Sequence, residues 1–169
     1  FKEKIKQALN STFKVISDNF ETSKKKNEIK NSDKFNLLEL DNLNSKTNFI
    51  KARAETDSFA LQEKFSNKEI FKKNLPSNSS CRSLYSFAEK IRCESLGGKM
   101  LKGIQKNLTE NYNQQIDLKR KDQLKSREDV NVNEAFELYM LKKFHNIELN
   151  SLTNKMLSFW ESYFDKSIN

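Results

Sequence analysis

Apolar residues recur at three- and four-residue steps through much of this chain. From Phe1 to about Phe20 they fall on one face of an amphipathic helix, as expected at 3.6 residues per turn. The same spacing predicts further helices at about 46–65, 80–96, 99–112, 133–145 and 150–166. A short helix is expected to begin at Ser66, because Ser66 and Glu69 form a capping-box pattern, and to end before Pro76.

Two segments interrupt this periodicity. Residues 21–47 are rich in Lys, Asn and Ser around a small apolar group, and we expect an irregular connection that folds back onto the helices. Residues 113–130 are almost entirely polar and predict a linker or an exposed helical extension. Three Gly and one Pro are too few for a sandwich or barrel with many tight turns. The sequence therefore predicts one all-α domain over 1–169, with about six or seven helices.

A helical hairpin at about 80–112 is expected at the centre of this domain. Ser79 or Ser80 can cap its first helix, and Gly97 with Gly98 is expected to end that helix as a C-cap. Gly103, on the second helix, is expected to allow close approach of another backbone.

Charged residues accompany these glycines. Glu89 and Arg92 are three residues apart and can pair on the helix surface. Glu94 precedes the expected break, and Asn107 lies on the second helix. The cluster fits a tightly packed hairpin, and it fits equally well a functional surface.

Composition excludes several classes of protein. At 169 residues the chain has the size of one ordinary domain, and it lacks a run of about eighteen apolar residues that could span a membrane. No secretion leader is recognisable, and the start at Phe1 rather than Met suggests a trimmed piece. Cys81 and Cys93 on one helix would lie about 18 Å apart, too far for a disulfide. We expect small buried thiols and a cytoplasmic location.

Catalytic chemistry has few candidates in this sequence. The single histidine, His145, rules out a His-rich metal site, and its place near a helix C-terminus suggests a capping or cationic role. Gly97-Gly98 before Lys99 lacks the spacing of a phosphate-binding loop, so no nucleotide site is expected. We therefore expect no catalytic residue, cofactor or metal ligand within this chain.

The net charge of +8 has two explanations. It can indicate an acidic partner such as nucleic acid. It also follows from a genome rich in A/T codons, which would supply Lys, Asn, Ile and Phe without selection for binding. The basic stretch 119–121 is interleaved with Asp117 and Asp122, as on a solvated helical face. Nucleic-acid binding is therefore not the favoured interpretation.

The stretch from Cys81 to Leu108, CRSLYSFAEKIRCESLGGKMLKGIQKNL, resembles the N-terminal region of the CobT family. The first element of the resemblance lies on the first hairpin helix and consists of Arg82, Tyr85, Ser86, Phe87, Glu89, Ile91, Arg92, Glu94, Ser95 and Gly97. The second element lies on the next helix and consists of Leu101, Gly103, Ile104, Gln105, Asn107 and Leu108. An upstream run adds Arg53, Ala54, Asp57, Ala60 and Leu61. The chain departs from the family at Ser66 and Asn67, which replace a His-Asp pair, and at Phe71, which replaces a His.

The resemblance implies a subunit of the aerobic, ATP-dependent cobaltochelatase. The whole complex would use ATP, Mg²⁺ and Co²⁺ to insert cobalt into hydrogenobyrinic acid a,c-diamide. Its partners would be an AAA+ ATPase subunit (CobS-like) and a large tetrapyrrole-binding subunit (CobN-like). The family's acidic linker and C-terminal von Willebrand A-type domain are not in this sequence. The region present would be a non-catalytic docking and assembly domain.

The hairpin residues are the candidates for docking, against the AAA+ ring or the family's acidic linker. The candidate interface or hairpin positions are Arg82, Glu89, Arg92, Glu94, Gly97, Lys99, Gly103 and Asn107. Two alternatives stay open. One is a helical domain of an AAA+ and von Willebrand-type remodelling chaperone for another metalloprotein, and the other is a basic helical nucleic-acid-binding module.

Overall fold

The computed structural model describes residues 2–18, 45–117, 124 and 126–168. Its helices are α1 (Lys2–Ile16), α2 (Lys46–Phe65), α3 (Lys68–Lys73), α4 (Ser79–Met100), α5 (Lys102–Asp117), α6 (Val132–Phe144), α7 (Ser151–Ser158) and α8 (Glu161–Ile168). A 3₁₀ turn at Arg127–Asp129 precedes α6. These residues contain helices and no strand, so the all-α prediction is confirmed.

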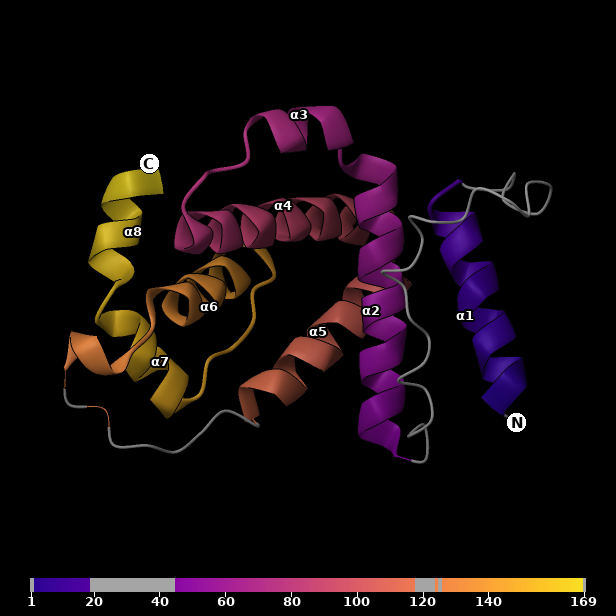
Figure 1. Cartoon of the computed structure of the whole chain (residues 1–169). Coiled ribbons are helices and arrows are strands. Elements are labelled where there is room, and N and C mark those ends of the chain that lie inside the picture. The colour runs from indigo at the N-terminus through magenta and orange to yellow at the C-terminus, as the bar shows by residue number, and fades with distance from the viewer. Residues whose placement is uncertain (1, 19–44, 118–123, 125, 169) are drawn as a thin grey trace.

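The long helix α2 is the centre of the arrangement (Figure 1). Helix α1 packs on one side of α2, and α4 and α5 pack on the other side and against each other. Helix α6 lies against α4 and connects this group to α7 and α8. The buried side chains of α2, α4, α5, α6 and α7 form one continuous core. α2 is thus covered from both sides, as its buried residues require.

Asparagine side chains begin four of the helices. Asn67, Asn78, Asn131 and Asn150 precede α3, α4, α6 and α7, and each accepts a hydrogen bond from a backbone amide of the first turn. This satisfies donors that have no partner within the helix. The predicted caps Ser66 and Ser79 or Ser80 are therefore wrong by one or two residues.

The predicted end of the first hairpin helix is also wrong. Helix α4 continues through Gly97 and Gly98 to Met100, and neither glycine has a positive φ angle. The chain turns instead at Leu101, whose extended backbone separates α4 from α5. The reason for the glycine at position 97 is packing, as shown below.

Three other boundaries differ from expectation. The predicted helix at 150–166 is divided in two, α7 and α8, with the break at Phe159 and Trp160. The polar stretch 113–130 begins inside α5, which extends to Asp117; residues 118–123 and 125 lie outside the described part. The irregular connection expected at 21–47 lies outside it up to residue 44, and residues 45–47 are the cap and start of α2.

The corner between α7 and α8 is fixed by a cation between two rings. The Arg127 guanidinium lies 3.9 Å from the ring centre of Trp160 and 4.1 Å from that of Tyr163. Such cation–π contacts hold a charged side chain against an apolar surface. They attach the 3₁₀ turn before α6 to the corner between α7 and α8 and to α8 itself. Within the described ranges no helix is both long and apolar enough to cross a membrane.

Candidate functional site

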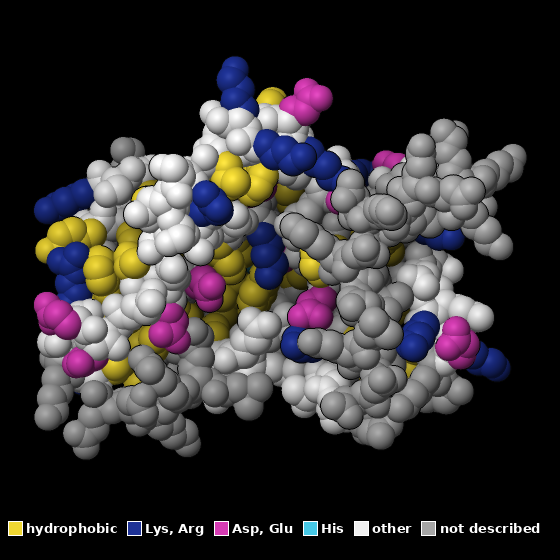
Figure 2. Space-filling model, viewed as in Figure 1, with side chains coloured by type: hydrophobic (Ala, Val, Ile, Leu, Met, Phe, Trp, Pro, Cys, Tyr) yellow, Lys and Arg dark blue, Asp and Glu magenta, His cyan; other side chains and the backbone are white. Residues whose placement is uncertain are grey.

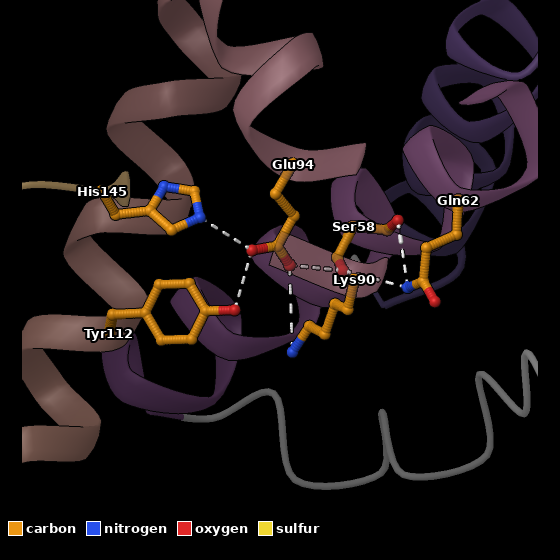
Figure 3. Close-up of polar contacts among 6 residues, drawn as sticks. All are labelled: Ser58, Gln62, Lys90, Glu94, Tyr112 and His145. Atoms are coloured by element: carbon orange, nitrogen blue, oxygen red, sulfur yellow. Dashed lines mark hydrogen bonds and ion pairs between the residues drawn. The ribbon is translucent and has the colours of Figure 1, made fainter. Parts of the chain in front are cut away.

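A buried carboxylate stands where α2, α4, α5 and the end of α6 meet (Figure 3). The Glu94 side chain has no exposed surface. Its Oε1 accepts a hydrogen bond from Ser58 Oγ at 2.6 Å and lies 3.8 Å from Lys90 Nζ. Its Oε2 accepts a hydrogen bond from Tyr112 Oη at 2.8 Å and lies 3.1 Å from His145 Nε2. We call these five residues the Glu94 cluster.

The cluster stabilises the ionised form of its central residue. Burial alone would raise the pKa of Glu94, but the hydrogen bond with His145 and the charge of Lys90 outweigh it, and the pKa is lowered. Burial and the adjacent carboxylate raise the pKa of Tyr112, so its hydroxyl remains a donor. A buried charge is tolerated only when it is paired and hydrogen-bonded. Glu94 meets this condition, and its oxygens are engaged in holding helices together.

Lys90 links the cluster to an open cavity of about 430 Å³ between α2, α4 and α5. Its Nζ lies 5.8 Å from the ring centre of Phe87 and 5.4 Å from that of Tyr112, within the range of cation–π attraction. The ammonium therefore has two rings and one carboxylate as neighbours. It covers the side of the Glu94 cluster that faces solvent.

A second polar contact joins α2 to α5. Asn107 Nδ2 donates a hydrogen bond to Asp57 Oδ2 at 2.7 Å. Burial raises the pKa of Asp57, against the opposing effects of Asn107 and of the nearby Arg53 guanidinium. Asp57 is therefore a buried acid whose ionised form is only partly compensated.

An apolar contact joins α4 to α2. Gly97 on α4 packs directly against the buried Leu61 side chain on α2. A Cβ atom at Gly97 would lie within 2.8 Å of the Leu61 Cγ and both Cδ atoms, so no larger residue fits without a shift. At Gly103 a Cβ would meet nothing within 4 Å. The close approach predicted at Gly103 is therefore wrong, and it occurs at Gly97.

The predicted pair of Glu89 and Arg92 is confirmed. The Arg92 guanidinium donates to both Glu89 oxygens, at 2.7 and 2.8 Å, and this hydrogen bonding lowers the pKa of Glu89. Arg92 also donates to the Phe65 carbonyl oxygen at 2.9 Å, which ties α4 to the end of α2. Burial and the Glu89 charge raise the pKa of Cys93 to about 11, so this thiol is protonated at neutral pH.

The remaining candidate positions lie on the surface. The exposed Arg82 donates to the carbonyl oxygens of Pro76 and Ser77 and so fixes the loop before α4. Lys99 is exposed in the last turn of α4. Glu94 does not share this surface, and its place in an exposed docking cluster is excluded by its burial. The expectation of two buried cysteines holds for Cys93 and is wrong for Cys81, which is exposed.

Sequence reasoning missed most of the Glu94 cluster. Lys90 lies four residues before Glu94 on one helix, so spacing alone could have found that pair. Ser58 and His145 lie 36 and 51 residues from Glu94 along the chain, and no local pattern joins them. His145 does lie at the C-cap of α6 as expected, with its side chain directed to Glu94. In the part of the chain that is described, no group of three or more His, Cys, Asp or Glu is placed to hold a metal ion.

Replacing Asp57 with Asn tests whether the buried, ionised carboxylate of Asp57 lowers the stability of the fold at neutral pH. The folded pKa is raised above the ordinary 3.8, so the Asp57 contribution to stability is complete below pH 3.8 and declines as pH rises through the folded pKa. The substituted amide would keep an acceptor for Asn107 and carry no charge. We expect the free energy of unfolding at pH 7 to stay equal or to rise by about 1 kcal/mol in urea titrations.

The matched control is Asp57→Ala, which leaves the Asn107 amide without its partner. It is expected to cost about 1–3 kcal/mol. A loss of more than about 2 kcal/mol for Asp57→Asn at pH 7 would show instead that the charge itself is needed.

Comparison with known proteins now identifies the family. Searches of curated proteins and of solved structures returned no significant match. The sequence profile of the family described as "Cobalamin biosynthesis protein CobT" matches residues 2–169. The match covers the helices and polar contacts described above, including both hairpin elements. The chain therefore belongs to the CobT family and has a role in cobalamin biosynthesis as a cobaltochelatase subunit.

Proposed function

We propose that this domain is a non-catalytic docking and assembly element of the cobaltochelatase complex. It would help join an AAA+ ATPase subunit to a large tetrapyrrole-binding subunit in the cytoplasm. The assembled enzyme would use ATP and Mg²⁺ to insert Co²⁺ into hydrogenobyrinic acid a,c-diamide. In this proposal, the domain supplies surface and rigidity, while ATP hydrolysis and metal insertion occur on the partners.

The observation that carries the proposal is that residues of the CobT resemblance make contacts between helices. Asn107 binds Asp57, Gly97 packs on Leu61, and Glu94 is enclosed in its cluster. The first two contacts each join two helices, and the Glu94 cluster joins α4 to α2, α5 and the end of α6. Such a set of residues is suited to holding a shape, which is what a docking domain offers a partner.

Exposed side chains near the end of α4 could form the surface that contacts a partner. Met100 and Leu101 are 62% and 49% exposed, and the exposed Lys99 precedes them. Large apolar side chains in solvent mark contact surfaces when they lie together, and charges beside them steer association. On the face seen in Figure 2, Lys and Arg are scattered among Asp and Glu. That distribution favours a protein partner over the nucleic-acid alternative.

Light scattering after size-exclusion chromatography tests the proposal. The chain is mixed with the AAA+ subunit of its own organism, with and without ATP, and we expect co-migration at a defined stoichiometry. Lys99→Glu should weaken the complex, because it reverses a charge beside the exposed end of α4. Lys155→Glu, an equally exposed lysine on α7, is the matched control. Separate migration in both nucleotide states contradicts the docking role.

A further inference from the structure

An open groove runs between α1, α2 and the start of α5, with a volume of about 700 Å³. Its lining is mostly apolar, and the apolar members are Ile5, Ala8, Leu9, Ile16, Phe49, Leu101 and Ile104. Phe49 and Leu101 are 37% and 49% exposed. On α1 the lining runs from Lys4 to Ile16, about 18 Å along the helix axis, which equals some three helical turns.

The rim of this groove is basic. Each of its three helices contributes one exposed cation: Lys4 from α1, Arg53 from α2 and Lys102 from α5. Among the residues that the structure describes, Asp57 is the one acidic member of the lining, and its carboxylate accepts a hydrogen bond from Asn107. The groove therefore combines an apolar floor with a net positive edge.

We propose that this groove binds an acidic amphipathic helix of a partner protein. The apolar side chains of that helix would lie on the floor, and its carboxylates would face Lys4, Arg53 and Lys102. An amphipathic helix in an apolar groove is a recurrent mode of recognition, and charge complementarity selects the partner and speeds the encounter. The inference rests on the proposed docking function and specifies the surface and the chemistry of the partner.

Gly103 is a position at which a substitution can test binding in the groove. It is exposed, lines the groove, and has open space where a Cβ would be. Gly103→Leu therefore adds a large side chain at a lining position, with no overlap at its Cβ. Gly98→Ala is the matched control, because that Cβ would make only an ordinary contact, 3.4 Å from Gln105, and Gly98 is not part of the groove lining.

Fluorescence anisotropy of the full chain tests the proposal with two designed peptides. Both carry Leu at helical spacing on one face, and the other face carries Glu in one peptide and Lys in the other. We expect the Glu peptide to bind at least about tenfold more tightly than the Lys peptide, and high salt to weaken it. Gly103→Leu should weaken that binding about tenfold or more, whereas Gly98→Ala should not change it.

Three results would overturn the proposal. Equal binding of the Glu and Lys peptides, or unchanged binding to Gly103→Leu, would show that the basic groove is not the site. The chain's own stretch 35–43, FNLLELDNL, has the same apolar and acidic character. If that stretch occupies the groove, the Glu peptide will not bind the full chain and Gly103→Leu will lower the melting temperature. That outcome would also overturn the proposal that a partner helix binds in the groove.

Co-migration with the AAA+ subunit separates this inference from the proposed function. If wild type and Gly103→Leu co-migrate equally well, docking stands and the groove is not its surface. If wild type does not co-migrate but binds the Glu peptide through the groove, the AAA+ docking role fails while the groove inference stands.

Discussion

Glu94→Ala is expected to lower the free energy of unfolding by about 3–5 kcal/mol. The substitution removes the carboxylate shared by Ser58, Tyr112 and His145, so the buried Tyr112 hydroxyl and His145 Nε2 lose this partner and the Ser58 hydroxyl loses its acceptor. Domains of this size are stable by only about 5–15 kcal/mol, so the loss would approach unfolding. Urea titration followed by far-ultraviolet circular dichroism measures it.

Two variants control for this result. Glu94→Gln keeps an acceptor oxygen but no charge, and should cost less than Glu94→Ala. Glu89→Gln weakens the Arg92 pair, which is partly exposed to solvent, and should cost about 1 kcal/mol or less. A loss below about 1 kcal/mol for Glu94→Ala would mean that the cluster contributes no net stability.

Acid titration tests the direction in which folding shifts the pKa of Glu94. The folded pKa of Glu94 lies below its ordinary 4.5, so its contribution is present above pH 4.5 and is lost as pH falls through the folded pKa. Wild type should lose this part of its stability on acidification. Glu94→Gln should not show that loss.

Gly97→Ala is expected to be the most damaging change of a single methyl group. Its Cβ would overlap the Leu61 side chain, which is 1% exposed and packed on all sides. Overpacking of this kind costs about 1–3 kcal/mol, and it outweighs the gain of up to about 1 kcal/mol that Ala brings to a helix interior. Calorimetry should show a lower melting temperature.

The other two glycines are internal controls of the same chemistry. Gly103→Ala meets nothing within 4 Å and should not destabilise; because Gly103 is the second residue of α5, its gain should be smaller than the ~1 kcal/mol of a helix interior. Gly98→Ala makes an ordinary contact with Gln105 and should change stability little. If all three substitutions gave the same result, helix propensity and not the approach to Leu61 would explain the glycine at 97.

The helices could be predicted because their apolar spacing is local. Helix α2 begins and ends within a residue of the prediction, since its pattern is long and Ser45 caps it. The end of α4 could not be predicted from Gly97 and Gly98, because a glycine that ends a helix and a glycine that admits a neighbouring helix look alike in sequence. Which role applies depends on Leu61, 36 positions earlier along the chain.

The sequence pointed to Glu94 but not to the other four members of its cluster or to the geometry that joins them. The i, i+3 rule correctly predicted the pair of Glu89 and Arg92. Two other predicted positions, Glu94 and Asn107, make hydrogen bonds to α2. The sequence placed Glu94 in a charged cluster that fitted a packed hairpin or a functional surface, and its complete burial was not predicted. Its burial requires His145, and a contact over 51 residues depends on the assembled fold and not on local spacing.

The Glu94 cluster also determines where the molecule can be divided. The polar stretch after α5 resembles a boundary between modules, yet His145, beyond that stretch, contacts the carboxylate of Glu94, before it. Helix α4 packs on α6 across the same stretch. A fragment ending at Asp117 would retain a buried acid without its imidazole and an apolar α4 face without its cover. The smallest autonomous unit therefore includes helices from both sides, and a shorter excision for binding studies would yield two incomplete halves.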